Sequence, residues 1–153
     1  SFEIKQGDKV AIYGSNGSGK STLIKILLGL NDEYTGEIKL ASNLKISYIP
    51  QDTSALIGSL NEYIYKQGVD ETLCKTILRK LDFARDLFEM DMKNAVSLSK
   101  PAHLFVWDEP LNYIDVISRI QIEEIIKEAN PTLIFVEHDK RFVEDIANKI
   151  IQL

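Results

Sequence analysis

The chain has 153 residues, of which 44% are hydrophobic and 27% charged, and its formal net charge at pH 7 is −5. This length suits one globular domain, and the acidic balance argues against a broad basic surface for nucleic acid. The one cysteine excludes an internal disulfide, and with two widely separated histidines it gives no zinc-binding pattern.

The sequence gives no sign of a membrane segment. No apolar run is long enough to span a bilayer, and no signal-peptide pattern is present. We therefore expect a cytoplasmic protein with no direct membrane insertion. The first residue is Ser1 and a strand-like run begins at once, so we expect the sequence to be an excerpt from a longer protein.

The N-terminal third predicts short strands and one helix. Strand-like runs cover residues 2–5 and 9–13, with a Gln-Gly-Asp turn between them. A glycine-rich loop follows, and apolar residues at helical spacing then predict a helix over residues 21–30. Short strands are predicted over residues 37–40 and 45–49.

The middle of the sequence changes character at Ser59. Ser59 and Glu62 fit a capping box, in which a hydroxyl and a carboxylate satisfy free amides of the first helical turn. Apolar residues then recur at roughly helical spacing. We expect a small helical subdomain over about residues 59–94.

The C-terminal third alternates strands with helices. Continuous apolar runs predict buried parallel strands over residues 103–107 and 132–136. An amphipathic helix is predicted over residues 115–129, another helix from about Lys140, and a last strand over residues 149–153. This alternation implies an α/β fold with a mostly parallel sheet.

The glycine-rich loop predicts a phosphate-binding site. Glycines let the backbone approach phosphates closely, and amides at the N-terminus of the next helix favour an anion. Lys20 would reach the β and γ phosphates of a nucleotide, and Ser21 would ligate Mg²⁺. The alternative is a glycine-rich turn that binds nothing. The residues that match G-x-x-x-x-G-K-[ST] are Gly14, Ser15, Asn16, Gly17, Ser18, Gly19, Lys20 and Ser21, and Thr22 completes the predicted nucleotide-binding set.

Two acids end the apolar strand over residues 103–107. Carboxylates at the C-terminal end of a parallel strand lie beside the phosphate loop in such sheets. Asp108 would then hold Mg²⁺, and Glu109 would act as general base or orient the attacking water. The alternative is that both acids are solvated strand caps. His138 follows the second apolar strand and could contact the γ phosphate, whereas His103 precedes a strand and receives no role.

Together these segments resemble the motifs of ABC ATPases, in the same order along the chain. The segments are Gly14–Ser21 (Walker A), Tyr48-Ile49-Pro50-Gln51 (Q-loop), Trp107-Asp108-Glu109-Pro110 (Walker B and its glutamate), Leu111-Asn112-Tyr113-Ile114-Asp115 (D-loop) and Glu137-His138-Asp139 (switch-histidine loop). The resemblance implies that Gln51 contacts Mg²⁺, binds nucleotide and couples the core to the helical subdomain. It also implies that Asp115 touches a partner cassette and that His138 is the switch histidine. The implied cofactors are ATP and Mg²⁺.

The same resemblance implies the fold class and the domain organisation. The fold would be that of a P-loop NTPase, in an ABC-type cassette with a mostly parallel core sheet, a small antiparallel β region and a helical subdomain. Residues 1–153 would form a single nucleotide-binding domain, with its ATP-binding core over residues 1–58 and 95–153.

A finer resemblance points to the ABC-F group, whose members carry two cassettes in one chain. Three segments, Trp107–Asp115, Val116–Glu124 and Glu137–Phe142, are similar to the second cassette of antibiotic-resistance ABC-F proteins from Gram-positive bacteria. Those proteins bind the ribosome near its tRNA sites and displace drugs. The implied partners are a second cassette, in the same chain or as a homodimer, and the ribosome.

One motif of the family is missing. ABC cassettes carry an L-S-G-G-Q-like signature before Walker B, and here Leu98-Ser99 is followed by no glycine. We infer that about three helical turns are absent at the Asn94–Ala95 junction. An engineered deletion, a natural deletion or a disordered loop omitted from the sequence would each explain this, and we favour the last.

Three functions remain open from the sequence. The first is the ATPase module of a ribosome-acting ABC-F protein. The second is the ATPase subunit of a membrane transporter that docks on permease subunits. The third is a non-catalytic nucleotide switch, against which the presence of Glu109 and His138 argues. With no signature from a partner cassette, the isolated domain should hydrolyse ATP slowly or not at all.

Overall fold

The computed structural model describes residues 1–51, 70, 72–73, 76, 100–112, 114 and 116–153. These residues form five strands and three helices that have defined ends. In chain order they are β1 (Lys9–Tyr13), α1 (Lys20–Leu27), β2 (Ile46–Ile49), β3 (Leu104–Asp108), α5 (Val116–Ala129), β4 (Leu133–Val136), α6 (Lys140–Ile146) and β5 (Lys149–Gln152).

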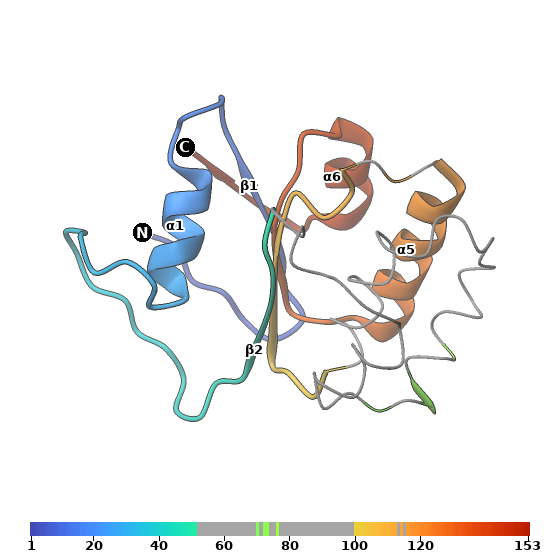
Figure 1. Cartoon of the computed structure of the whole chain (residues 1–153), viewed down its shortest axis with the longest axis horizontal. Helices are drawn as coiled ribbons and strands as arrows, with labels where there is room; N and C mark the ends of the chain where they lie inside the picture. Colours follow the sequence, from blue (N-terminus) through green and yellow to red (C-terminus); the bar gives the residue numbers. More distant parts are fainter. Residues whose placement is uncertain (52–69, 71, 74–75, 77–99, 113, 115) are drawn as a thin grey trace, which may run out of the picture.

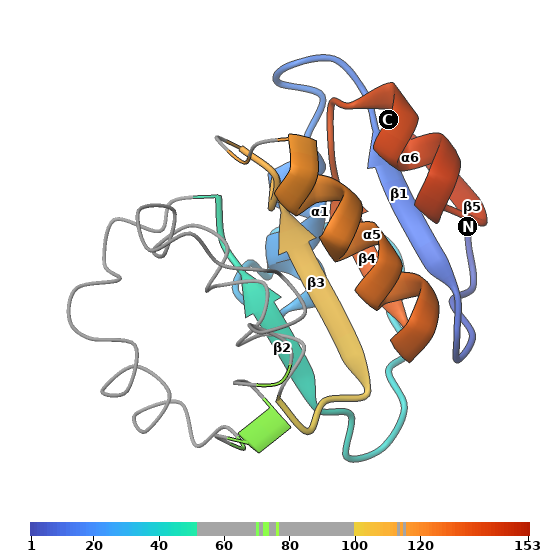
Figure 2. The same ribbon diagram turned by 90° about the vertical axis from the view of Figure 1, so that its right-hand side faces the viewer.

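The five strands make one parallel sheet in the order β2-β3-β4-β1-β5. Helix α1 covers one face of the sheet, and α5 and α6 cover the other (Figures 1 and 2). The central strands are therefore buried on both faces, which is why β3 and β4 are continuous apolar runs in sequence.

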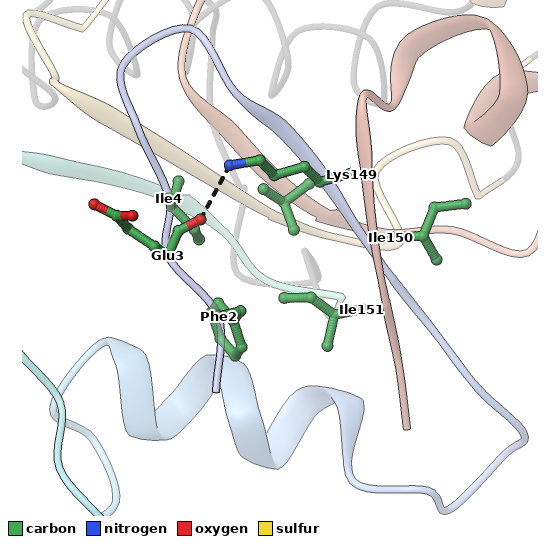
Figure 3. A pocket seen from close by; sticks show the side chains of 7 residues that line it. Phe2, Glu3, Ile4, Lys149, Ile150 and Ile151 are labelled. Atoms are coloured by element: carbon green, nitrogen blue, oxygen red, sulfur yellow. Dashed lines mark hydrogen bonds between the residues drawn. The ribbon is translucent and has the colours of Figure 1, made fainter.

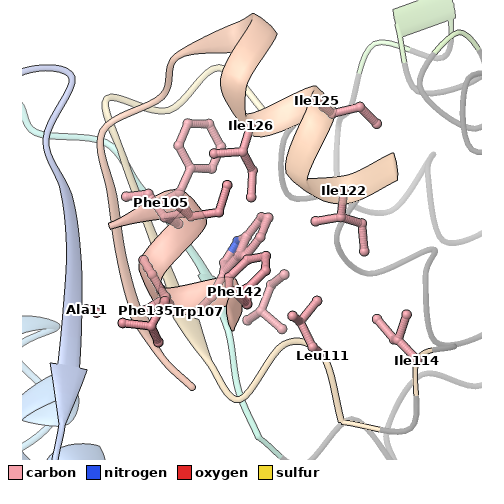
Figure 4. Close-up of a cluster of buried hydrophobic side chains, with 14 residues drawn as sticks. Ala11, Phe105, Trp107, Leu111, Ile114, Ile122, Ile125, Ile126, Phe135 and Phe142 are labelled. Atoms are coloured by element: carbon pink, nitrogen blue, oxygen red, sulfur yellow. The ribbon is translucent and has the colours of Figure 1, made fainter. Parts of the chain in front are cut away.

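Alternation along the strands divides the buried side chains into two clusters. Phe105 and Trp107 of β3 point to the α5–α6 side, whereas Leu104 and Val106 point to the α1 side. Figure 4 shows the cluster on the α5–α6 side, in which Phe142 of α6 meets Phe135 of β4 edge to face, with ring centroids 5.4 Å apart. This packing fixes the sheet between two helical layers and so fixes the positions at which its strands end.

The predicted strands over residues 2–5 and 37–40 are wrong. Within residues 1–51 and 100–153, apart from positions 113 and 115, every strand pair is parallel, so the small antiparallel β region is not seen there. A strand needs a hydrogen-bonded neighbour, and residues 37–40 are mostly exposed. The Lys5 backbone is instead engaged in a turn, in which Lys5 N donates to Asp8 Oδ2 and Asp8 N donates to Lys5 O.

The segment before β1 lies beside β5 without pairing with it. The Nζ of Lys149 donates to the carbonyl oxygen of Glu3 at 3.1 Å, as Figure 3 shows. Phe2 and Ile4 line an open apolar groove of about 440 Å³ together with Ile150 and Ile151. Side-chain packing and the hydrogen bonds of Lys149 Nζ to Glu3 O and Asp8 Oδ2 therefore hold this segment beside β5, in place of a backbone ladder.

The other predicted elements that fall on described residues are present, and their ends differ from the prediction by at most three residues. Helix α1 ends earlier than the predicted residue 30, because Gly29 adopts a φ of 68° and stops it. Asp139 caps α6 by accepting a hydrogen bond from Phe142 N at 2.9 Å. The capping box at Ser59, nearly all of the helical subdomain, the Asn94–Ala95 junction and Asp115 lie outside the described residues.

No helix in the described part of the chain is both long enough and apolar enough to span a bilayer.

Candidate functional site

The predicted site residues follow the C-terminal ends of four neighbouring strands. Strand β4 lies between β1 and β3, and Asp108 is paired with Val136 in register. The chain leaves β1 toward α1 on one face of the sheet and leaves β4 toward α6 on the other (Figure 1). Open parallel sheets bind ligands at such a point, where the connections diverge.

The loop between β1 and α1 adopts a conformation that requires glycine at two positions. Gly17 has a φ of 79°, and Gly19, the N-cap of α1, has a φ of 96°. Gly14 is required for another reason, because a Cβ there would lie 2.5 Å from Ser18 Oγ and 2.8 Å from the Leu153 carbonyl oxygen. The loop therefore passes very close to the end of β5.

Lys20 points back into this loop. Its side chain is buried, with 8% of the residue exposed, and its Nζ donates to the carbonyl oxygens of Gly14 and Ser15 at 2.9 and 2.8 Å. An ammonium group held at the N-terminus of α1, beside amides that have no partner within the helix, favours a bound anion. Ser15, Asn16 and Thr22 lie exposed around it.

Ser21 and Asp108 meet across the sheet end. Asp108 is only 3% exposed, and burial raises the pKa of its carboxyl, although the Ser21 hydrogen bond and the charges of Lys20 and Lys25 act in the opposite direction. Its Oδ1 and the hydroxyl of Ser18 are buried and have no hydrogen-bond partner within the part of the chain that the structure describes. Such orphaned oxygens suit a ligand that the protein alone does not supply.

The side-chain oxygens of Ser21 and Asp108 form a donor set that fits Mg²⁺. A magnesium ion in a nucleotide site takes one or two protein oxygens and completes its shell with phosphates and water. Ser21 and Asp108 provide a hydroxyl and a carboxylate in direct contact. Among the residues with described positions, no group of three or more acids, histidines or cysteines could hold a metal ion.

Glu109 is the centre of a hydrogen-bond network. Its Oε2 accepts from Gln51 Nε2 and Asn112 Nδ2, each at 2.8 Å, and its Oε1 lies 3.0 Å from His138 Nε2. Burial alone would raise the pKa of the Glu109 carboxyl, but the hydrogen bonds from Asn112, His138 and Gln51 outweigh it and lower that pKa. The side chain is therefore an ionised acceptor at neutral pH.

The backbone of Glu109 is strained, with a φ of 52° that residues other than glycine rarely adopt. Its N–H donates to the Val136 carbonyl at 3.0 Å, so the turn that begins at Glu109 is tied to the end of β4. Strained backbone persists only where neighbouring contacts determine it, and it is frequent at functional sites.

Sequence reasoning missed two members of this network. Asn112 lies three residues after Glu109 in the same turn, and that spacing was the available signal. Glu137 is buried between the turn and the His138 loop and accepts hydrogen bonds from Leu111 N at 2.9 Å and His138 N at 3.1 Å. Burial raises the pKa of the Glu137 carboxyl, and these amides act against that rise.

The structure thus brings most predicted site residues together in two adjoining groups. Lys20, Ser21 and Asp108 form the first, and Gln51, Glu109 and His138 form the second. Gln51 touches Glu109, whereas its predicted contact with Mg²⁺ stays a prediction. His103, which received no role, accepts a hydrogen bond from Lys45 N at the opposite end of β3.

Comparison with protein families gives a match for most of the chain. A family model described as ABC transporter matches residues 1–112, which include the glycine-rich loop and the turn after β3. The match covers well over half of the sequence.

Two curated relatives and one solved structure show the range of similar proteins. ABC transporter F family member 2 of Arabidopsis thaliana is 32% identical over 167 residues, covering 98% of this chain and 25% of the relative. Ribosome protection protein VmlR of Bacillus subtilis is 30% identical over 161 residues, covering 96% and 29%. A chain in the crystal structure of the archaeal ribosomal stalk protein aP1 with the ribosome recycling factor aABCE1 aligns with a TM-score of 0.79 and 25% identity, covering 97% and 32%.

Proposed function

Because this chain belongs to the ABC transporter family of ATPase domains, we propose that it binds and hydrolyses ATP as one half of a paired cassette. The observation that carries this proposal is the junction of the two residue groups, where the Ser21–Asp108 pair adjoins Glu109 with His138 on its carboxylate. A site that only bound nucleotide would need Lys20, Ser21 and Asp108 but neither Glu109 nor His138.

For nucleotide binding, the proposal assigns the loop from Gly14 to Ser21 to the phosphates of ATP. Lys20 would exchange its two loop carbonyls for phosphate oxygens, which are better partners for an ammonium group. Ser21 and Asp108 would hold Mg²⁺, which neutralises charge on the phosphates. Gln51 would lie at the same ion, within reach of Glu109.

For hydrolysis, the proposal assigns the reacting water to Glu109. The carboxylate would orient that water, or accept its proton, as the water oxygen bonds to the γ phosphorus and the bond to the β–γ bridging oxygen breaks. His138 shares Oε1 of Glu109 and would contact the γ phosphate. A second cassette would close the site, so a chain without one should turn over slowly.

For the biological setting, we propose an ABC-F protein that acts on the ribosome. The support comes from relatives with that name or that role, among them VmlR. The chain spans about a quarter to a third of the length of the curated relatives it matches, so the whole protein's partners are part of this proposal. The second-cassette position, the Gram-positive source and the antibiotic-resistance role belong to it as well.

The runner-up is the ATPase subunit of a membrane transporter, which the description of the matching family favours. In that setting the single domain proposed for residues 1–153 would dock on permease subunits through the region after Gln51.

One experiment separates the two settings. The full-length protein carrying Glu109→Gln is mixed with ribosomes, with and without ATP, and centrifuged through a sucrose cushion. The substitution should trap ATP, so ATP-dependent pelleting is expected from the ABC-F proposal. ATP hydrolysis by the unsubstituted protein, without pelleting of the variant, would favour the transporter. Undiminished hydrolysis by the Glu109→Gln variant would remove Glu109 from the catalytic role.

A further inference from the structure

Glu137 is a buried carboxylate that joins two loops of the site. It follows β4 directly and is 5% exposed. One oxygen accepts from Leu111 N at 2.9 Å, in the turn that begins with Glu109. The other accepts from His138 N at 3.1 Å, and the Asp139 amide also donates to this carboxyl. The side chain therefore spans the two segments whose ends carry Glu109 and His138.

Without Glu137, the backbone N–H groups that donate to it would lose their acceptor, which would destabilise this part of the fold. Leu111 is 4% exposed, and a buried N–H without an acceptor destabilises the conformation that buries it. No other acceptor for Leu111 N is present in the described part of the chain. Removal of the Glu137 carboxyl would thus release the turn rather than merely loosen a surface contact.

The turn that begins at Glu109 is expected to move once the hydrogen bonds to Glu137 are lost, because its backbone is strained. Glu109 is held at a φ of 52°, and its ties to β4 are the hydrogen bond from its own N–H to Val136 O and the His138 contact. Strain of this kind relaxes when the contacts that enforce it are lost. Relaxation at Glu109 would carry its carboxylate away from His138 Nε2.

We propose that Glu137 is a positioning residue, whose carboxylate clamps the turn of Glu109 and Asn112 to the loop of His138 and thereby aligns Glu109 for water attack. It touches neither nucleotide nor water in this role and acts through Glu109 and His138. The inference rests on the proposed function, because it assigns Glu137 to the turnover step of that function.

Substitution of Glu137 should leave the phosphate-binding residues in place. Lys20 and Ser21 lie on α1, and their contacts run to Gly14, Ser15 and Asp108, none of which Glu137 touches. Loss of the clamp is therefore expected to lower the rate of turnover while leaving nucleotide affinity in place. A residue needed only for folding would lower both.

The test compares Glu137→Ala and Glu137→Gln in the full-length protein, by steady-state ATPase kinetics and by equilibrium binding of labelled ATP. A misplacement of about 1 Å costs about 10²-fold in rate, so kcat should fall by about that factor in Glu137→Ala, with ATP affinity within about threefold. Glu137→Gln keeps one acceptor oxygen and should retain an intermediate kcat. If the alanine variant does not fold, the glutamine variant decides by the same two measurements.

Glu123→Gln is the matched control. Glu123 is also a buried carboxyl, 6% exposed, whose pKa burial raises, but it lies on α5 and its charged neighbours are Asp145, Lys127, Arg141 and Arg119. The kcat of the Glu123→Gln variant should equal that of the unsubstituted protein. An equal loss of kcat in Glu123→Gln, or a parallel loss of affinity and kcat in the Glu137 variants, would show a structural effect and overturn the proposal.

Two further comparisons test this inference: a double substitution with His138→Ala, and a comparison of the Glu137 variants with Glu109→Gln. In a His138→Ala background, Glu137→Ala should add little, because the contact that the clamp serves is already gone. Unchanged kcat in both Glu137 variants, while Glu109→Gln stops turnover, would overturn the clamp alone. Full turnover by Glu109→Gln would overturn the proposed function.

Discussion

Gln51 and Glu109 are 58 residues apart in sequence and share a hydrogen bond of 2.8 Å. They meet because β2 and β3 are neighbours in register, with Ile49 beside Trp107, so the residues that follow the two strands emerge together. Gln51 and Asn112 hold one oxygen of the Glu109 carboxylate, and His138 holds the other. The carboxylate is thus oriented before any ligand arrives.

The hydrogen bond from Asn112 to Glu109 can be tested by introducing a negative charge at position 112. Asn112→Asp places a second carboxylate where an amide now donates to Glu109 at 2.8 Å, so the two side chains should repel each other. We expect kcat for ATP to fall by about 10²-fold in Asn112→Asp and by about tenfold in Asn112→Ala, which loses one hydrogen bond to a charged acceptor. Asn31→Asp, which adds the same charge on an exposed loop, should match the unsubstituted protein. Equal rates in Asn112→Ala and Asn112→Asp would contradict the charge argument.

The Lys20 prediction concerns binding rather than turnover. Lys20→Ala removes the ammonium group at the N-terminus of α1 and should abolish ATP binding at this site. Equilibrium dialysis with labelled ATP should then count one bound nucleotide fewer per full-length chain. Lys39→Ala is the control, since Lys39 is exposed and pairs only with Glu37 among the described side chains. Undiminished ATP stoichiometry in Lys20→Ala would remove the phosphate-loop assignment.

Gly14 should tolerate no side chain. A Cβ there would meet Ser18 Oγ at 2.5 Å and the backbone carbonyl of Leu153 at 2.8 Å, and the carbonyl cannot rotate away. We expect Gly14→Ala to cost about 1–3 kcal/mol of stability and to weaken ATP binding as the loop shifts. Gly36→Ala has open space around its Cβ, although its φ is 120°, and should leave ATP affinity unchanged. Thermal melting and an ATP titration measure the two effects, and unchanged affinity in Gly14→Ala would be the contrary result.

Asp139 should stabilise the fold in a pH-dependent way. The hydrogen bond from Phe142 N, with help from the Arg119 guanidinium, lowers the pKa of Asp139 below its ordinary value. A carboxyl whose folded-state pKa is lowered stabilises the fold above its unfolded pKa of about 4, and this contribution disappears as pH falls through the folded-state pKa. Asp139→Ala should therefore cost about 1–2 kcal/mol at pH 7 and progressively less below about pH 4.

Chemical denaturation of both proteins across this pH range measures the Asp139 effect. Asp145→Ala is the matched control on the same helix, because its pair with Arg141 is exposed and should contribute less than about 1 kcal/mol. A free-energy difference for Asp139→Ala that stays constant down to pH 3 would contradict the capping account.

Two of the strands that the sequence predicted correctly, β3 and β4, are strong apolar runs. The runs at β3 and β4 are long enough that burial on both faces decides their structure. The segments over residues 2–5 and 37–40 failed because a strand also needs a neighbour, and which segment lies beside which depends on the whole sheet.

Some residues of the site could be predicted from local sequence patterns, whereas others depend on contacts between segments that are distant in sequence. The loop residues from Gly14 to Ser21 and the acids Asp108 and Glu109 were predictable, since local spacing and strand ends identify them. Glu137 was not predictable, because its contact with Leu111 depends on the register of β3 against β4, which pairs Asp108 with Val136. Asn112 was missed although its signal is local, since it lies three residues after Glu109 in the same turn.

The strand order also bears on how the chain folds as it is synthesised. Strand β1 pairs with β4 and β5, with Lys9 beside Leu133 and Val10 beside Lys149, so the earliest strand has no described strand partner until the last part of the chain appears. Contacts this distant in sequence form slowly. The phosphate loop would then leave the ribosome long before the strands beside it, and the nascent chain should acquire affinity for ATP at this site only after β4 and β5 have been synthesised.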